Sequence, residues 1–222
     1  MIISAKHADI SNSDNIVIYD LNMTIDEGDF VYITGKVGTG KSSIFRAFTA
    51  QTKPVSGELI VNGYNLNKLK SRDIPKLRRS IGVVFQDLQL LNDRNVHDNL
   101  SFVLRATGWK KEAEIEKRIN DVLNMVGVST KSHKYPYQLS GGEQQRVCIA
   151  RSILNEPKII LADEPTASLD KDTAESIMIL FDKLNKELNT AIIIITHDND
   201  IIRRHPGKIY HCENESCILK DA

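Results

Sequence analysis

A glycine-rich segment has the spacing of a phosphate-binding loop. Residues 35–42 match the pattern G-x-x-x-x-G-K-[ST] in full, and they directly follow an apolar run at residues 30–34. The glycines let successive N–H groups point at phosphate oxygens, aided by the positive end of the helix that follows. Lys41 is placed to reach the β- and γ-phosphates, and the Ser42 hydroxyl to bind Mg²⁺. The residues expected to hold a nucleoside triphosphate are Gly35, Lys36, Val37, Gly38, Thr39, Gly40, Lys41, Ser42 and Ser43.

Two carboxylates stand at the end of another apolar run. Residues 159–162 lead into Asp163 and Glu164. An acid in the place of Asp163 holds Mg²⁺ through water in P-loop enzymes, and Glu164 is then placed to orient or deprotonate the attacking water. Two acids after a strand are weak evidence alone, but beside residues 35–42 they predict nucleotide hydrolysis.

Short apolar strands alternate with longer amphipathic helices, which is typical of an α/β protein with a mostly parallel sheet. We expect strands at residues 30–34, 158–162 and 191–196, each rich in branched side chains. Helices are expected at residues 41–50 and 172–188, the second with apolar side chains at helical spacing. These elements form the expected nucleotide-binding core.

The N-terminal part departs from this alternation. Residues 1–30 and 57–63 predict an antiparallel β subdomain with polar turns, such as the one at residues 61–63. Within it, Tyr19 falls in a strand at residues 16–21, and we expect its ring to pack in the core.

The middle of the chain carries no strand signal. Residues 88–138 are expected to be mostly helical, most clearly at residues 111–126. The sequence thus predicts one domain over residues 1–222, with a core of residues 1–87 and 139–222 and a helical subdomain of about 88–138.

Residues 139–146, LSGGEQQR, form a second candidate anion site. Ser140 and the N–H groups after it begin a predicted helix, whose N-terminus can receive a γ-phosphate. The run resembles the signature motif of ABC ATPases, and the resemblance covers nearly the whole chain. It implies an ATPase whose signature meets ATP held by the other subunit of an ATP-dependent homodimer. The residues implied to act in trans are Ser140, Gly141, Gly142 and Glu143.

Three further positions match the same family. Gln86, after a strand at residues 81–85, resembles the Q-loop glutamine that contacts Mg²⁺ and senses a membrane subunit. Asp170 resembles the D-loop aspartate at the dimer interface, and His197 resembles the switch histidine that contacts the γ-phosphate. The implied catalytic residues are Glu164, His197, Lys41 and Gln86, and the implied Mg²⁺ ligands are Ser42, Gln86 and, through water, Asp163.

The aromatic side chain that stacks on adenine in this family has no counterpart. The matching stretch, residues 10–13, reads Ile-Ser-Asn-Ser. We therefore expect ATP to be preferred only loosely over GTP.

A narrower resemblance, to the FtsE type of bacterial cell-division ATP-binding subunits, rests on residues 72–82, 84–87 and 90–99, above all the run DRNVHDN at 93–99. It implies an integral membrane partner of the FtsX type, control of cell-wall hydrolases, and a place on the cytoplasmic face of the inner membrane, held there by that partner. The alternative is the ATPase of a lipoprotein-releasing or macrolide-type exporter. A hypothetical docking patch for the partner comprises Leu88, Leu90, Leu91 and Val96, which could instead anchor the helical subdomain to the core.

Composition narrows the function classes. Lys+Arg and Asp+Glu number 29 each among 222 residues, so no overall positive charge favours nucleic acid, and we expect no nucleic-acid partner. The ABC ATPases of DNA repair are a disfavoured alternative, because they carry long insertions where this chain has about fifty residues. No apolar run approaches the ~20 residues of a membrane-spanning helix, and residues 1–7 do not resemble a signal peptide.

The cysteines are expected to be structural. His211, Cys212 and Cys217 could form part of a metal site, but no fourth ligand is evident. We favour two strands joined by a turn at residues 213–216, with both thiols reduced. Cys148 is the third cysteine.

Overall fold

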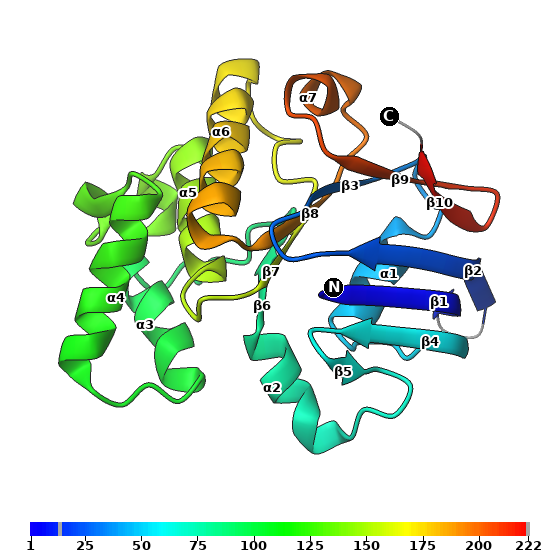
Figure 1. Ribbon diagram of the computed structural model, residues 1–222. Coiled ribbons are helices and arrows are strands. Elements are labelled where there is room, and N and C mark those ends of the chain that lie inside the picture. The colour runs from blue at the N-terminus through cyan, green and yellow to red at the C-terminus, as the bar shows by residue number, and fades with distance from the viewer. Residues whose placement is uncertain (13–14, 221–222) are drawn as a thin grey trace.

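A computed structural model describes residues 1–12 and 15–220 and confirms the α/β architecture. Its larger sheet has the strand order β10-β9-β3-β8-β7-β6, in which β9, β3, β8, β7 and β6 run parallel and β10 closes an antiparallel hairpin (Figure 1). The strands are β3 Phe30–Thr34, β6 Ile81–Val84, β7 Ile159–Asp163, β8 Ala191–Ile195, β9 Lys208–Glu213 and β10 Ser216–Lys220. The predicted strands at residues 30–34, 158–162 and 191–196 are therefore confirmed.

Both faces of the parallel sheet are buried, which explains why its strands are almost wholly apolar. Along β3, Val31 and Ile33 enter one core, and Tyr32 enters the other. Strands β7 and β8 alternate in the same way, since side chains of a strand point to opposite faces in turn.

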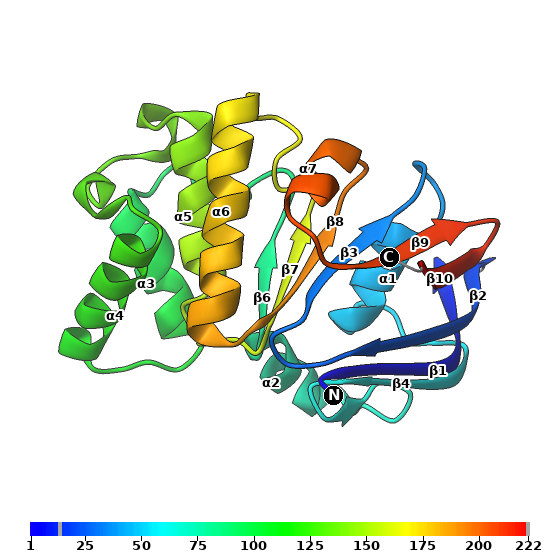
Figure 2. The same cartoon turned by 45° about the horizontal axis from the view of Figure 1, so that its top comes forward.

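Helices cover the two faces of this sheet (Figure 2). Helix α1, Lys41–Phe48, lies between the parallel sheet and the antiparallel one, where Ile44, Phe45, Ala47 and Phe48 are buried. Helices α5, Gly141–Ser152, and α6, Lys171–Leu188, pack on the opposite face. The short helices α2, Ile74–Arg79, and α7, Asn199–Arg204, lead into β6 and follow β8.

The predicted antiparallel β subdomain is confirmed, with the order β2-β1-β4-β5. Its strands are β1 Ile3–Asn12, β2 Asn15–Ile25, β4 Ser56–Val61 and β5 Tyr64–Asn65. The expectation for Tyr19 is wrong, because its side chain is 47% exposed, whereas Ile18 beside it is fully buried. Period-two alternation in β2 turns one of these neighbours inward and the other outward.

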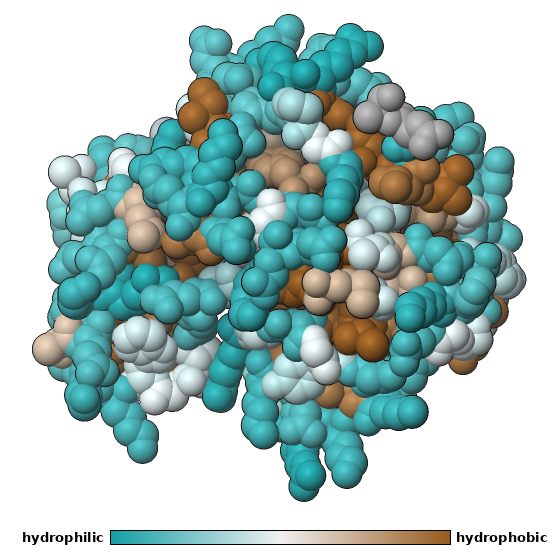
Figure 3. Space-filling model, viewed as in Figure 1, coloured by the Kyte–Doolittle hydropathy of each residue, from teal (hydrophilic) through white to brown (hydrophobic). Residues whose placement is uncertain are grey.

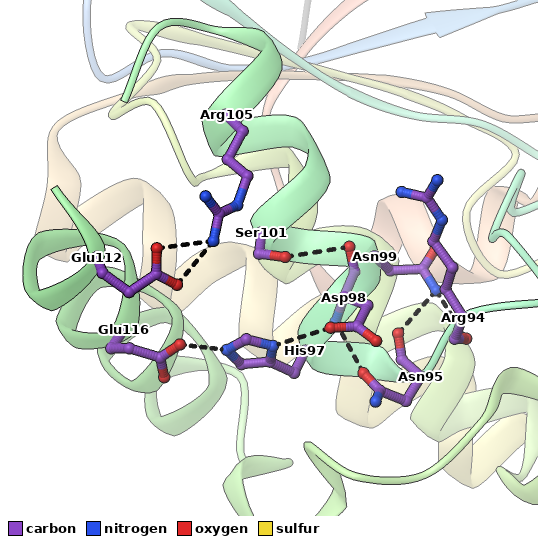
Figure 4. Close-up of polar contacts among 9 residues, drawn as sticks. All are labelled: Arg94, Asn95, His97, Asp98, Asn99, Ser101, Arg105, Glu112 and Glu116. Atoms are coloured by element: carbon purple, nitrogen blue, oxygen red, sulfur yellow. Dashed lines mark hydrogen bonds and ion pairs between the residues drawn. The ribbon is translucent and has the colours of Figure 1, made fainter. Parts of the chain in front are cut away.

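Residues 88–138 contain helices α3, Val96–Ala106, and α4, Glu112–Met125, and the structure assigns no strand there. Two side-chain contacts join the helices: His97 Nε2 lies 2.7 Å from Glu116 Oε1, and Arg105 Nη2 donates to both carboxylate oxygens of Glu112 (Figure 4). Short 3₁₀ turns occur at Ser71–Asp73, Ser129–Lys131 and Pro136–Gln138. The boundary of a separate helical subdomain stays a prediction.

The hypothetical docking patch of three leucines and one valine is mostly not exposed. Val96 is fully buried, and Leu88 and Leu90 are half-buried against the same core cluster. Only Leu91 is exposed, at 38%. Leu88, Leu90 and Val96 therefore pack against the core, as the alternative given above expects, whereas Leu91 does not.

Exposed hydrophobic side chains gather on part of one face of the molecule. Figure 3 shows a mostly hydrophilic face with a hydrophobic area over the β9–β10 hairpin, where Ile218 and Leu219 are exposed. Among the described residues, no helix is both long and apolar enough to cross a membrane.

Candidate active site

The phosphate-binding loop runs from the end of β3 into α1, as its sequence context predicts. Gly35 has φ 138° and Gly40 has φ 91°, values that disfavour other L-residues. A Cβ on Gly35 would lie 2.3 Å from the Cys212 carbonyl oxygen, and one on Gly40 would lie 2.8 Å from the Ile18 side chain. The loop is thus confined between β9 and β2, which fixes the direction of its N–H groups.

Lys41 folds back over this loop. Its Nζ donates to the carbonyl oxygens of Gly35 and Lys36, at 2.7 and 2.8 Å. The buried ammonium group of Lys41 needs such acceptors, because burying a charge without hydrogen-bond partners costs free energy. Phosphate oxygens could replace these carbonyls as acceptors once a nucleotide is bound.

A cavity of about 290 Å³ gathers the main predicted groups. Residues of the loop line it together with Gln86, Asp163 and Glu164, which come from the ends of β6 and β7. The hydroxyl of Ser42, the amide of Gln86 and the carboxylate of Asp163 supply only oxygen ligands of the kind that Mg²⁺ prefers. The donor set therefore fits this ion.

Burial raises the pKa of Asp163, and the neighbouring charge of Glu164 raises it further, while Lys41 lowers it. Two carboxylates partly removed from water destabilise each other unless cations lie close to them. The two carboxylates therefore favour the binding of a cation beside Asp163.

Glu164 and His197 form a direct contact. Nδ1 of His197 lies 2.6 Å from Oε1 of Glu164. Glu164 has φ 45°, an uncommon conformation for a residue other than glycine, and its N–H donates to the Ile195 carbonyl at 2.9 Å. The carboxylate is mostly buried while the imidazole is exposed, so the histidine can turn toward a bound ligand.

The signature segment begins α5 through a reciprocal capping box. The Glu143 N–H donates to Ser140 Oγ at 3.3 Å, and the Ser140 N–H donates to the Glu143 carboxylate at 2.9 Å. That N–H and the ion pair with Lys131 lower the pKa of Glu143. The glycine pair also has a packing reason, since a Cβ on Gly142 would lie 2.5 Å from Thr173 of α6.

The signature and the D-loop line a second cavity, of about 370 Å³. It includes Ser140, Gly141, Ser168 and Asp170, and it shares no lining residue with the cavity at the phosphate-binding loop. Asp170 caps α6, because its carboxylate accepts from the N–H and the hydroxyl of Thr173, and these bonds lower its pKa. The signature segment and the phosphate-binding loop of one chain thus line different cavities.

The region expected to face adenine contains side chains that belong to none of the sequence motifs described above. Asn12, Val17 and Arg46 line the 290 Å³ cavity, and Arg46 Nη1 donates to Asn12 Oδ1 at 3.1 Å. Ile10 is fully buried in the antiparallel core, and Ser13 lies outside the described residues. The position of Arg46 on α1, one helical turn beyond Ser42, is the signal that could have identified it.

The C-terminal cysteines occupy the predicted hairpin. Cys212 of β9 faces Cys217 of β10, with the sulfur atoms 2.7 Å apart, and both thiols are free and buried. His211 Nδ1 lies 2.8 Å from the hydroxyl of Thr34, at the end of β3. The hairpin thus packs against the base of the phosphate-binding loop.

Comparisons with known proteins agree with this geometry. The model of the ABC transporter family matches residues 18–167. The chain is 42% identical over 204 residues to the cell division ATP-binding protein FtsE of Mycobacterium tuberculosis, covering 91% of this chain and 88% of that protein. It is 41% identical over 183 residues to the methionine import ATP-binding protein MetN of Helicobacter pylori, covering 82% of this chain and 56% of that protein.

Among solved structures, a dimeric ATP-binding cassette in a post-hydrolysis state with ADP and Pi superimposes with a TM-score of 0.85 at 33% identity. The match covers 99% of this chain and 98% of that one.

Proposed function

Because the chain belongs to the ABC transporter family and is an ATPase subunit of that family, we propose that two copies share two ATP sites and work beneath an FtsX-like membrane partner in cell division. The separation of the two cavities carries the shared-site part of the proposal. Because Ser140 does not line the cavity of its own chain's phosphate-binding loop, we infer that the γ-phosphate it receives comes from a second copy.

The proposed cycle uses the residues of the 290 Å³ cavity and its rim. The N–H groups of residues 35–42 and Lys41 hold the phosphates, and Ser42, Gln86 and, through water, Asp163 hold Mg²⁺. When bound by these residues, the ion would supply positive charge beside the phosphate groups. Binding in the first cavity and contact with the partner's Ser140 close the dimer.

Hydrolysis in this scheme depends on Glu164. Its carboxylate accepts a proton from, or orients, the water that attacks the γ-phosphate in line. His197 holds that carboxylate and turns toward the γ-phosphate, as its contact and exposure permit. Loss of phosphate then removes the ligand common to both chains, and the interface reopens.

The membrane partner is proposed to enter a groove on another side of the chain. A cavity of about 440 Å³ lies between β6, α3 and the end of α5. Its apolar lining includes Val83, Phe85 and Val103, and its charged lining consists of Arg78, Arg79 and Arg151. An amphipathic helix with carboxylates beside its apolar face fits this surface.

The cell-division role rests on the similarity to FtsE, and the proposed place is the cytoplasmic face of the inner membrane, through the partner. The similarity to MetN supports a second candidate, the motor of a substrate-importing complex. Identification of the membrane chain that co-purifies with this one separates them: an FtsX-like protein supports the first, and a permease supports the second.

Complementation tests the shared sites. Lys41→Ala and Ser140→Arg variants should each be inactive as homodimers, but a mixed dimer retains one site with an intact phosphate-binding loop and an intact signature. We expect the mixture to recover ATP hydrolysis, up to about a quarter of wild-type activity for statistical pairing and independent sites. A mixture as inactive as its components would contradict the proposal.

A further inference from the structure

The segment directly after Gln86 has an unfavourable backbone conformation. Leu88 has φ 60° and Gln89 has φ 50°, so two successive residues other than glycine are left-handed. L-residues avoid this region because Cβ approaches the following carbonyl oxygen. Contacts from outside the segment must therefore hold it.

Arg151 and Cys148, both on α5, supply such contacts. Arg151 Nη2 donates to the Leu88 carbonyl at 2.7 Å, and Nη1 donates to the Gln89 carbonyl at 2.5 Å. Cys148 Sγ also lies 3.2 Å from the Leu88 carbonyl. The rigid guanidinium fork fixes the direction of both carbonyls as well as their position, which one donor could not do.

Arg151 stands where three functional parts of the chain meet. It belongs to the last turn of α5, the helix that begins after Ser140. It also lines the 440 Å³ groove beside Phe85, the residue that precedes Gln86. Gln86 itself lines the nucleotide cavity, so a single side chain joins the groove, the segment after Gln86 and the signature helix.

We propose that Arg151 is a positioning residue that ties the segment after Gln86 to the signature helix. A shift of Gln86, caused by nucleotide in its cavity or by a helix in the groove, is then passed through the fork to α5 and to Ser140 at its other end. This inference rests on the proposed role of Gln86 in ATP hydrolysis. It adds a residue that touches neither nucleotide nor Mg²⁺.

The same chain contains a matched control. Arg118 of α4 also donates to two successive carbonyls, those of Leu154 at 2.9 Å and Ile153 at 2.6 Å. These carbonyls follow the C-terminal end of α5, so the chemistry and the helix are the same. Among the described residues, the polar contacts of Arg118 go to Ile153, Leu154 and Glu156 and none to the segment after Gln86, so we expect its role to be structural.

A double-mutant cycle on the purified full-length chain tests the proposal. The single variants are Arg151→Lys, Arg118→Lys and Gln86→Ala. The double variants combine Gln86→Ala with Arg151→Lys or with Arg118→Lys. Lysine keeps the charge but cannot fork across two carbonyls. The measurements are kcat and KM for ATP and the melting temperature, and Arg151→Gln serves as a second variant if Arg151→Lys does not fold.

We expect Arg151→Lys to lower kcat about tenfold with KM changed less than about twofold, since misplacement of a catalytic group affects the reacting state more than binding. In the Gln86→Ala background it should lower kcat no further, because both changes disable the same element. Arg118→Lys should lower the melting temperature at least as much but leave kcat near that of the wild type.

The inference would be overturned if Arg151→Lys and Arg118→Lys lowered kcat equally. It would also be overturned if Arg151→Lys lowered kcat by the same factor in the wild type and in the Gln86→Ala background. If Gln86→Ala alone hydrolysed ATP at the wild-type rate, the premise about Gln86 would fail first. The single variant thus distinguishes a failure of the proposed function from a failure of the inference.

Discussion

Nδ1 of His197 lies 2.6 Å from Oε1 of Glu164, across the ends of two neighbouring parallel strands. The register of β7 and β8, in which Asp163 pairs with Ile195, brings these side chains to one edge of the sheet. The contact gives the exposed imidazole two possible partners, the carboxylate and a bound phosphate.

The first prediction concerns His197→Ala. Loss of the imidazole frees the Glu164 carboxylate and removes a donor to the γ-phosphate, so kcat should fall by about 100-fold or more. The affinity for ATP should change little, because the phosphate-binding loop is intact. Steady-state hydrolysis and equilibrium nucleotide binding measure the two effects, with the exposed His133→Ala as the control. A wild-type kcat would remove His197 from the mechanism.

The second prediction concerns the nucleotide base. Asn12 lines the nucleotide cavity, and no aromatic side chain is among the described residues of that lining, so ATP and GTP should bind with dissociation constants within about tenfold of each other. Asn12→Tyr should tighten ATP binding by about two- to tenfold, the free energy expected of one added stacking contact. Lys53→Tyr, in an exposed loop outside the cavity, is the control. A much stronger preference for ATP in the wild type would show that other groups recognise adenine.

The third prediction concerns the 440 Å³ groove. Val103→Glu places a carboxylate among its apolar lining, so the membrane partner should no longer co-purify while ATP binding persists. The only tryptophan, Trp109, donates to Asn155 in the groove wall at 3.2 Å, so its fluorescence should change when the partner binds. Leu91→Glu is the control from outside the groove, and loss of the complex in that variant alone would move the interface back to the segment after Gln86.

The fourth prediction concerns pH. Burial disfavours protonation of His97, but hydrogen bonds and charges from Asp98 and Glu116 outweigh it and raise its pKa. Because the pKa of His97 is higher in the folded state, protonation of His97 stabilises the fold. This stabilisation is complete at pH values below the pKa of about 6.5 in the unfolded chain, and it is lost as the pH rises through the pKa of the folded state. The melting temperature of the wild type should therefore exceed that of His97→Gln more at about pH 6 than at about pH 8.5.

Exposed His133→Gln should show no such difference between the two pH values. If the difference in melting temperature between the wild type and His97→Gln were the same at both pH values, the α3–α4 contact would not depend on protonation of His97.

The sequence predicts those parts of the chain that local chemistry determines. Residues 35–42 need glycine for their backbone angles, and β3, β7 and β8 need apolar side chains on both faces. The glycine spacing and the apolar runs can therefore be recognised in the sequence itself. The roles assigned to the site residues remain predictions, although the structure brings Gln86, Asp163 and Glu164 into one cavity.

Features that depend on tertiary packing were missed. Tyr19 and Ile18 are neighbours in one strand, and only the pairing of β2 decides which of them faces the core. From sequence alone, Leu88, Leu90 and Val96 suggest an apolar surface, because the core cluster that buries them also draws on residues far along the chain, such as Val147 and Ile149. The fork of Arg151 joins residues more than sixty positions apart, for which no motif exists.

The central claim is that two copies share ATP between one chain's phosphate-binding loop and the other's signature. Glu164→Gln should bind ATP but not activate water, so that the closed dimer accumulates. The direct measurement is the molar mass of purified Glu164→Gln in solution, with and without ATP and Mg²⁺. The account predicts a monomer that becomes a dimer on addition of ATP, while Glu164→Gln with Ser140→Arg stays monomeric. A Glu164→Gln variant that hydrolysed ATP at the wild-type rate, or dimerised equally well with Ser140→Arg, would contradict it.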